Sequence, residues 1–135
     1  MIEFATIDIE RNTCRFQYVI EPSQDGNILF KVYPTENIDS YRWFSYVFRK
    51  ISPILIKGEN MTCNSNNEFR KKGIPEKIIQ IASVEYNSDV ISSPVEWNAG
   101  NFLVPPARKA WERLTRQNEN AVFDETVGCF ILRRG

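Results

Sequence analysis

The chain has 135 residues, its 17 lysines and arginines balance its 17 aspartates and glutamates, and it contains no histidine. Without an imidazole, Ser-His-Asp and Cys-His catalysis and the common zinc sites are excluded. Zero formal net charge argues against nucleic acid as a partner, while 42% hydrophobic residues suffice for the core of one domain spanning residues 1–135.

The three cysteines, Cys14, Cys63 and Cys129, lie far apart and form no C-x-x-C pair. Their odd number and their spacing argue against both a disulfide framework and a metal knuckle. The N-terminal residues do not have the pattern of a signal peptide, and no run of about 18 apolar residues occurs. We therefore expect a cytoplasmic protein with no membrane segment and no metal site.

The N-terminal residues alternate between apolar and polar with the period of β-strands. We expect a first strand over residues 2–9, with a bulge near Ala5 or Thr6 where the apolar residues change from even to odd positions. Two further strands, over residues 13–20 and 28–33, flank an Asp-Gly turn and predict a hairpin.

Helical spacing of apolar and aromatic residues then predicts an aromatic-rich helix over residues 37–50. Its aromatic side chains are typical of a core, and an acceptor pocket is the alternative. These side chains are Tyr41, Trp43, Phe44, Tyr46 and Phe48. A short strand over residues 54–56 follows, and the asparagine-rich segment 59–68 is expected to run from a strand end into a surface loop.

The second half of the sequence alternates between strand and helix patterns. We expect a helix over residues 74–87, a strand over 89–93, a second amphipathic helix over 107–116, and a final hairpin with strands 121–124 and 129–132. This order of elements predicts a mixed α/β sheet flanked by helices. Residues 1–58 would supply antiparallel strands and the aromatic helix, and residues 59–135 the half that binds a ligand.

The most informative motif is the loop Arg-Lys-Lys-Gly-Ile-Pro, residues 70–75, directly before the first helix of this half. A helix N-terminus offers free backbone N–H groups and partial positive charge, which suit a phosphate or pyrophosphate, and glycine lets the backbone approach it closely. The alternative is a solvated basic turn that caps the helix, which is the commoner meaning of so short a motif.

The sequence from residue 67 to 134 resembles the GNAT acetyltransferase superfamily, whose central motif is Q/R-x-x-G-x-G/A at the start of a helix that follows a strand. Arg70, Gly73 and the helix over residues 74–87 match this motif. Residues 107–114 are similar to a later helix of the family, and the final hairpin to its last two strands. The spacing is similar to that of small members from bacteria and their phages.

The resemblance implies that an acetyl group passes directly from acetyl-coenzyme A to an amine, in a reaction that needs no histidine. It implies a GNAT-like fold and these cofactor contacts: Arg70, Lys71, Lys72, Gly73 and Ile74. The acceptor amine, on a small molecule or a protein, stays open.

Two residues depart from the family pattern. Pro75 replaces the last small residue of the motif and has no N–H to donate, and a lost charge-assisted hydrogen bond costs about 1.5–3 kcal/mol. Trp111 stands where the tyrosine general acid of the family falls, and an indole is no useful acid near neutral pH.

Two side chains near the motif are candidates for catalysis. Glu59 is a candidate general base, although an exposed loop carboxylate is the commoner reading. Cys63 is a candidate acid, although a lone thiol without a basic neighbour is usually inert.

Two functions therefore remain open at this point. One is a coenzyme A-dependent N-acetyltransferase, and the other is a catalytically inactive GNAT-like binding or regulatory protein that binds a protein partner, with a phage or mobile element as one source. Exposed hairpin edges could also pair two copies of the chain into a homodimer.

Overall fold

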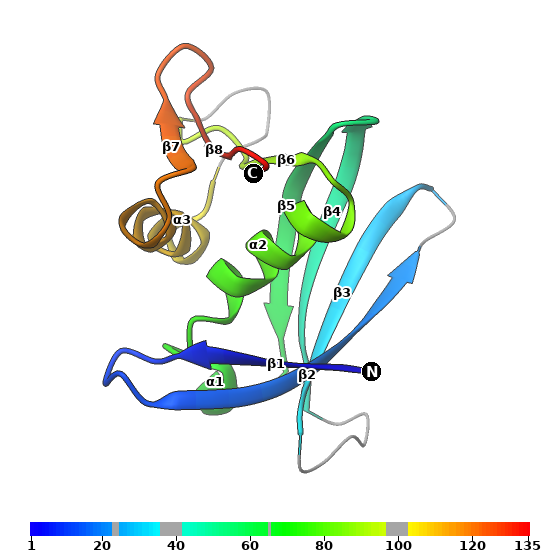
Figure 1. The fold of residues 1–135 in the computed structure, drawn as a ribbon, viewed down its shortest axis with the longest axis vertical. Helices are drawn as coiled ribbons and strands as arrows, with labels where there is room; N and C mark the ends of the chain where they lie inside the picture. The colour runs from blue at the N-terminus through cyan, green and yellow to red at the C-terminus, as the bar shows by residue number, and fades with distance from the viewer. Residues whose placement is uncertain (23–24, 36–41, 65, 97–102) are drawn as a thin grey trace.

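A computed structural model describes residues 1–22, 25–35, 42–64, 66–96 and 103–135, and it confirms the mixed α/β class (Figure 1). Its eight strands form one open sheet in the order β1-β2-β3-β4-β5-β6-β8-β7. The strands are β1 (Ile2–Ile7), β2 (Thr13–Pro22), β3 (Asn27–Pro34), β4 (Phe44–Ser52), β5 (Leu55–Cys63), β6 (Asp89–Ile91), β7 (Ala121–Asp124) and β8 (Cys129–Leu132).

Strands β1 to β5 form an antiparallel meander. The predicted hairpin of β2 and β3 is confirmed, but the bulge predicted in the first strand is wrong, because β1 pairs with β2 without a break from Ile2 to Ile7. Pairing with β2 fixes which side chains of β1 face inward, whatever their polarity. Thr6 is therefore buried, and Ile7 is 60% exposed.

The aromatic helix predicted over residues 37–50 is also wrong where the structure describes it, because residues 44–50 belong to strand β4. Residues 37–41, Tyr41 among them, lie outside the described residues. Phe44, Tyr46 and Phe48 alternate along β4 and are all buried in the core. Short aromatic runs fit helical and strand periods alike, and pairing with β3 and β5 on both sides decides for the strand.

The segment predicted as a strand end and loop over residues 59–68 is more regular than expected. Strand β5 continues to Cys63, and a short helix, α1 (Asn66–Phe69), follows. The strand that was expected over residues 54–56 is thus the beginning of a nine-residue strand, because pairing with β4 continues along its polar part.

Two longer helices, α2 (Ile74–Glu85) and α3 (Pro105–Gln117), confirm the two helices predicted in the second half. Figure 1 shows α2 crossing in front of β4 and β5, and α3 beside the hairpin of β7 and β8. Ile78, Ile79 and Trp111 on these helices are completely buried against the aromatic side of the sheet. No helix among the described residues is long and apolar enough to cross a membrane.

The pairing in the sheet changes from antiparallel to parallel between β5 and β6. These strands are parallel, with α2 as their crossover, and they pair at three positions only, from Leu55 opposite Asp89 to Lys57 opposite Ile91. Beyond these positions β5 runs on to Cys63 with β4 on one side and no described strand on the other. The sheet therefore opens along residues 58–63.

A β-bulge lies where the sheet opens. Val47 of β4 is opposite Asn60, whereas Phe48 is opposite Gly58, so Glu59 is an extra residue in β5. A bulge bends its strand and redirects the side chain of the inserted residue. The bulge and the end of the β5–β6 pairing together set the position of the site described next.

Candidate functional site

A cavity of about 370 Å³ lies at the opening of the sheet. Its walls come from β4, from residues 58–63 of β5, from the basic loop before α2, from the segment after β6, and from the start of α3. The cavity is therefore at the carboxyl ends of two parallel strands, which is where open α/β sheets usually bind ligands.

The basic loop contributes part of the predicted set to this cavity. Arg70, Lys71 and Gly73 line it, and both cationic side chains are exposed. Lys72 and Ile74 are not among its lining residues, and Ile74 is fully buried in the core. The structure thus brings three of the five predicted cofactor residues together at the cavity.

The charge of Lys72 acts on residues of the β1–β2 turn instead. The pKa of Asp8 in that turn is lowered, chiefly by the backbone N–H of Asn12 and to a smaller degree by the charge of Lys72. The pKa of Cys14 is raised, mainly by burial and then by Asp8, while Lys72 opposes the rise. Lys72 therefore interacts with Asp8 and Cys14, and none of these three residues lines the cavity.

Besides lining the cavity, Gly73 is needed for the backbone conformation and packing of the loop. It precedes α2 with φ of 78°, and a Cβ at this position would lie 2.8 Å from the carbonyl oxygen of Ile7. The first hairpin also forms a hydrogen bond with this loop, in which the backbone N–H of Ile9 donates to the carbonyl of Lys71 at 3.3 Å. The turn of the first hairpin therefore packs on the loop, and only glycine fits there without strain.

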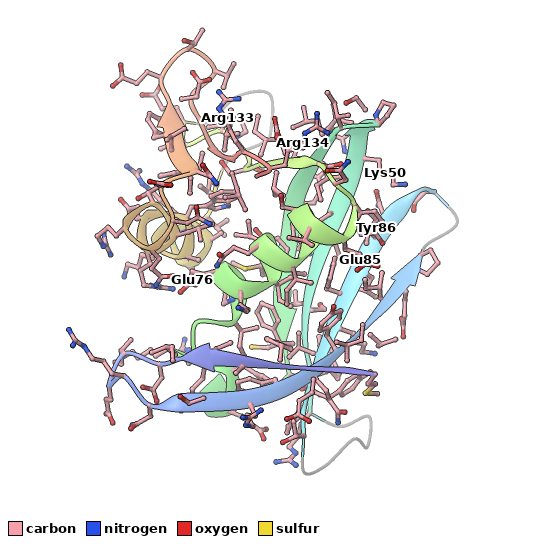
Figure 2. All side chains as sticks on the ribbon, viewed as in Figure 1. Lys50, Glu76, Glu85, Tyr86, Arg133 and Arg134 are labelled. Carbon is pink, nitrogen blue, oxygen red and sulfur yellow. The ribbon has the colours of Figure 1, made fainter. Side chains whose placement is uncertain are left out.

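The N-terminus of α2 is held to α3 by an ion pair between the buried Glu76 and the half-buried Arg113. Glu76 in its first turn is 2% exposed, and its carboxylate accepts from Arg113 Nε at 3.1 Å and from Arg113 Nη2 at 3.3 Å. Figure 2 shows Glu76 at the end of α2 that is nearer α3. Arg113 also lines the cavity, so this pair links the cavity wall to both helices.

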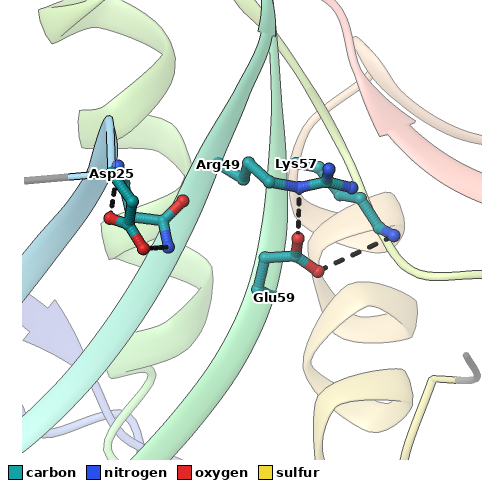
Figure 3. Close-up of polar contacts among 5 residues, drawn as sticks. Asp25, Arg49, Lys57 and Glu59 are labelled. Carbon is teal, nitrogen blue, oxygen red and sulfur yellow. Dashed lines mark hydrogen bonds and ion pairs between the residues drawn. The ribbon is translucent and has the colours of Figure 1, made fainter.

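The two predicted catalytic residues, Glu59 and Cys63, both line the cavity. The carboxylate of Glu59, the bulge residue, lies 2.6 Å from Arg49 Nε and 3.7 Å from Lys57 Nζ (Figure 3). Cys63 is a half-buried free thiol at the end of β5. To act as a base, Glu59 must first separate from Arg49 and Lys57 and then accept a proton from a substrate amine.

Trp111 is not a cavity residue. Its side chain is fully buried and stacks on Phe130, with ring centroids 6.1 Å apart and an interplanar angle of 19°. Its Nε1–H has no well-formed hydrogen bond, although it lies close enough to the Tyr46 hydroxyl to influence the pKa of that group. Trp111 therefore acts on the cavity only through Tyr46.

Tyr46, for which the sequence left a core and a pocket role open, is both buried and a cavity residue, and Gly58 is a cavity residue that the sequence analysis did not single out. Tyr46 is 3% exposed, and burial raises the pKa of its hydroxyl well above the usual value, with a smaller lowering by Trp111 and a smaller rise from Glu76. The signal that was available is Gly58, since an isolated glycine in a strand often marks the close approach of another group.

Comparison of the chain with protein-family models, with curated proteins and with solved structures gives no significant match. No group of three or more cysteine, aspartate or glutamate side chains in the described part of the chain could hold a metal ion.

Proposed function

We propose that this chain is a coenzyme A-dependent N-acetyltransferase of the GNAT type. The observation that carries the proposal is the open edge of β5 over residues 58–63, which has no strand partner among the described residues and borders the cavity. An extended ligand with amide groups can add to such an edge as a further strand. The pantetheine arm of coenzyme A has this chemistry.

The basic loop supplies the other half of the recognition. Arg70 and Lys71 lie at the cavity next to the N-terminus of α2, where positive side chains and helix N–H groups favour a pyrophosphate. A ligand with its phosphates on this loop and its arm along β5 would bring its thioester to the bulge at Glu59. The cavity and the open edge thus suit one and the same ligand.

The reaction then needs few groups. The acceptor amine attacks the carbonyl carbon of the thioester, a C–N bond forms, and the C–S bond breaks with release of coenzyme A. Glu59, freed from Arg49 and Lys57, or a water molecule takes the proton from the amine. The acceptor is an amine on a small molecule or a protein, and the three unpaired cysteines suit a cytoplasmic location.

Binding of acetyl-coenzyme A tests the proposal directly. At 100 times its Kd the ligand should stabilise the fold by about 2.7 kcal/mol, which raises Tm by roughly 10 °C. The double variant Arg70→Gln/Lys71→Gln should bind about 10- to 100-fold more weakly, because charge-assisted contacts to phosphate are lost.

The matched control for this experiment is Arg116→Gln/Arg133→Gln, which removes two exposed cations that do not line the cavity. It should bind acetyl-coenzyme A as the wild type does. Calorimetry and melting curves measure both effects. If the wild type shows no Tm shift at millimolar acetyl-coenzyme A, the acetyltransferase proposal fails.

A second candidate function is an inactive GNAT-like protein that binds a protein partner. The contact of the β1–β2 turn with the basic loop favours it, because the carbonyl of Ile7 occupies space beside Gly73 and Pro75 removes one N–H. Exposed Ile7 and Ile9 on the same turn give a partner an apolar surface. Absence of acetyl-coenzyme A binding in the experiment above favours this candidate.

A further inference from the structure

We propose that the Tyr46 hydroxyl, seated against Gly58 at the cavity wall, donates a hydrogen bond to the sulfur of coenzyme A and stabilises the leaving thiolate. The inference rests on the proposed function and goes beyond it, because it assigns a catalytic residue on β4. The helix that carries the acid in the resembling family has Trp111 at the corresponding position.

The position of the hydroxyl follows from Gly58. A Cβ on this residue would lie 2.7 Å from Tyr46 Oη, 3.1 Å from Cε1 and 3.2 Å from Cζ. The end of the tyrosine ring therefore lies over the backbone of β5, one residue before the bulge at Glu59 and at the point where β6 stops pairing. Tyr46 and Gly58 both line the cavity, so a ligand along the open edge of β5 meets this hydroxyl.

The ring is held in place by its neighbours. Tyr46 stacks on Phe48 with centroids 4.4 Å apart and an interplanar angle of 18°, and both rings are buried in the core. A donor fixed in this way loses little free energy to reorganisation when charge develops beside it. The hydroxyl is thus preorganised for its role.

Trp111 determines where the proton of the Tyr46 hydroxyl can point. Buried donors nearly always have an acceptor, yet the Trp111 Nε1–H has no well-formed hydrogen bond and has the Tyr46 oxygen nearby. An indole N–H has no lone pair to offer, so toward Tyr46 it acts only as a donor. The phenol proton is then left for an acceptor in the cavity.

The chemistry is hydrogen-bond donation without transfer of the phenol proton. Burial raises the pKa of Tyr46 and keeps the group protonated at neutral pH, which a donor requires. As the C–S bond breaks, its electron pair goes to sulfur, and the thiolate accepts the hydrogen bond from Tyr46. The proton of the amine leaves to Glu59 or water, so tyrosine is unchanged at the end of the reaction.

Titration of coenzyme A bound to the protein tests the inference without an acceptor amine. The absorbance of the thiolate reports the pKa of the bound thiol, and Tyr46→Phe should raise this pKa by about one to two units, because a charge-assisted hydrogen bond is lost. Affinity for acetyl-coenzyme A, which carries no thiolate, should change less than about threefold.

Tyr18→Phe is the matched control. Tyr18 is a buried core tyrosine at 5% exposure that does not line the cavity, and its variant should leave the pKa of the bound thiol unchanged. Gly58→Ala is a second variant, which displaces the Tyr46 hydroxyl without removing it and should raise the pKa in the same direction.

The outcomes separate the two proposals. If coenzyme A does not bind to the wild type, the acetyltransferase function and this inference both fail. If coenzyme A binds and the pKa of the bound thiol is the same in wild type, Tyr46→Phe and Tyr18→Phe, the function stands and the role of Tyr46 is overturned.

Discussion

Gly73 and Gly26 have nearly the same backbone conformation in very different surroundings. Their φ angles are 78° and 84°, but a Cβ would meet the Ile7 carbonyl at 2.8 Å in Gly73 and nothing within 4 Å in Gly26. Gly26→Ala should therefore lower the free energy of unfolding by about 1–2 kcal/mol, through left-handed strain alone. Gly73→Ala should lower it by about 2–5 kcal/mol, because overpacking adds to the strain.

Urea denaturation of the two alanine variants measures this difference. Equal losses would mean that the β1–β2 turn moves aside easily. Arg70 and Lys71 have exposed side chains, so that, unlike Gly73, they can be changed in a cofactor experiment without overpacking the loop. A change at Gly73 would alter the fold and the ligand site together.

At the level of single residues, the sequence marked candidate positions by a motif, a charge or a reactive side chain, and the cavity contains some of these positions and not others. The predicted residues that line the cavity are Glu59, Cys63, Arg70, Lys71 and Gly73, whereas Lys72 and Ile74 of the same motif do not line it. Tyr46 was assigned to a helix, where its contact with Gly58 cannot be foreseen. That contact depends on the pairing of β4 with β5, which cannot be predicted from the local sequence pattern of either strand.

The ion pair between Glu76 and Arg113 couples two elements, and its removal should be costly. Arg113→Gln would leave the Glu76 carboxylate, 2% exposed, without its cation, which should lower the free energy of unfolding by about 1–3 kcal/mol, because the Arg113 side chain is itself 36% exposed and water can replace part of its contact. Arg108→Gln is the control, because the Arg108–Glu112 pair on α3 is exposed and 3.8 Å long. That variant should cost less than about 0.5 kcal/mol.

Chemical denaturation of both arginine variants gives the comparison. A loss below 1 kcal/mol in Arg113→Gln would show that water or another side chain compensates the buried carboxylate. The double variant Glu76→Gln/Arg113→Gln should recover part of the loss, because no buried charge is then left unpaired.

Prediction at the level of elements succeeded where local chemistry was unambiguous. Pro75 and Pro105 stand in the first turns of α2 and α3, and the final hairpin was predicted with the bounds it has. Strand β4 was missed because its aromatic residues satisfy both periods, and only its two neighbours in the sheet settle its conformation.

The opening of the sheet has a consequence for the backbone of the whole molecule. Amides of β5 over residues 58–63 border a cavity on one side, so they should exchange hydrogen faster than those of β3, which has paired strands on both sides. Coenzyme A bound along the edge should slow exchange in residues 58–63 and 70–76.

Hydrogen exchange followed by mass spectrometry measures this change for every part of the chain. The hairpin of β7 and β8 is the internal control, because it does not line the cavity and should exchange equally with and without coenzyme A. Protection in that hairpin but not in β5 would place the ligand elsewhere.

The three residue pairs that join β5 to β6 also limit how long a ligand bound along the edge of β5 can be. An extended chain that enters beside Cys63 and follows β5 can advance only as far as Gly58, because Lys57 and Ile91 close the gap. Six residues of strand give roughly 20 Å of edge. The point where β5 and β6 begin to pair therefore limits the length of the chain that can bind along β5. Lengthening the pairing by even one position would shorten the arm that the molecule can accommodate, and so would select among ligands by reach and not by charge.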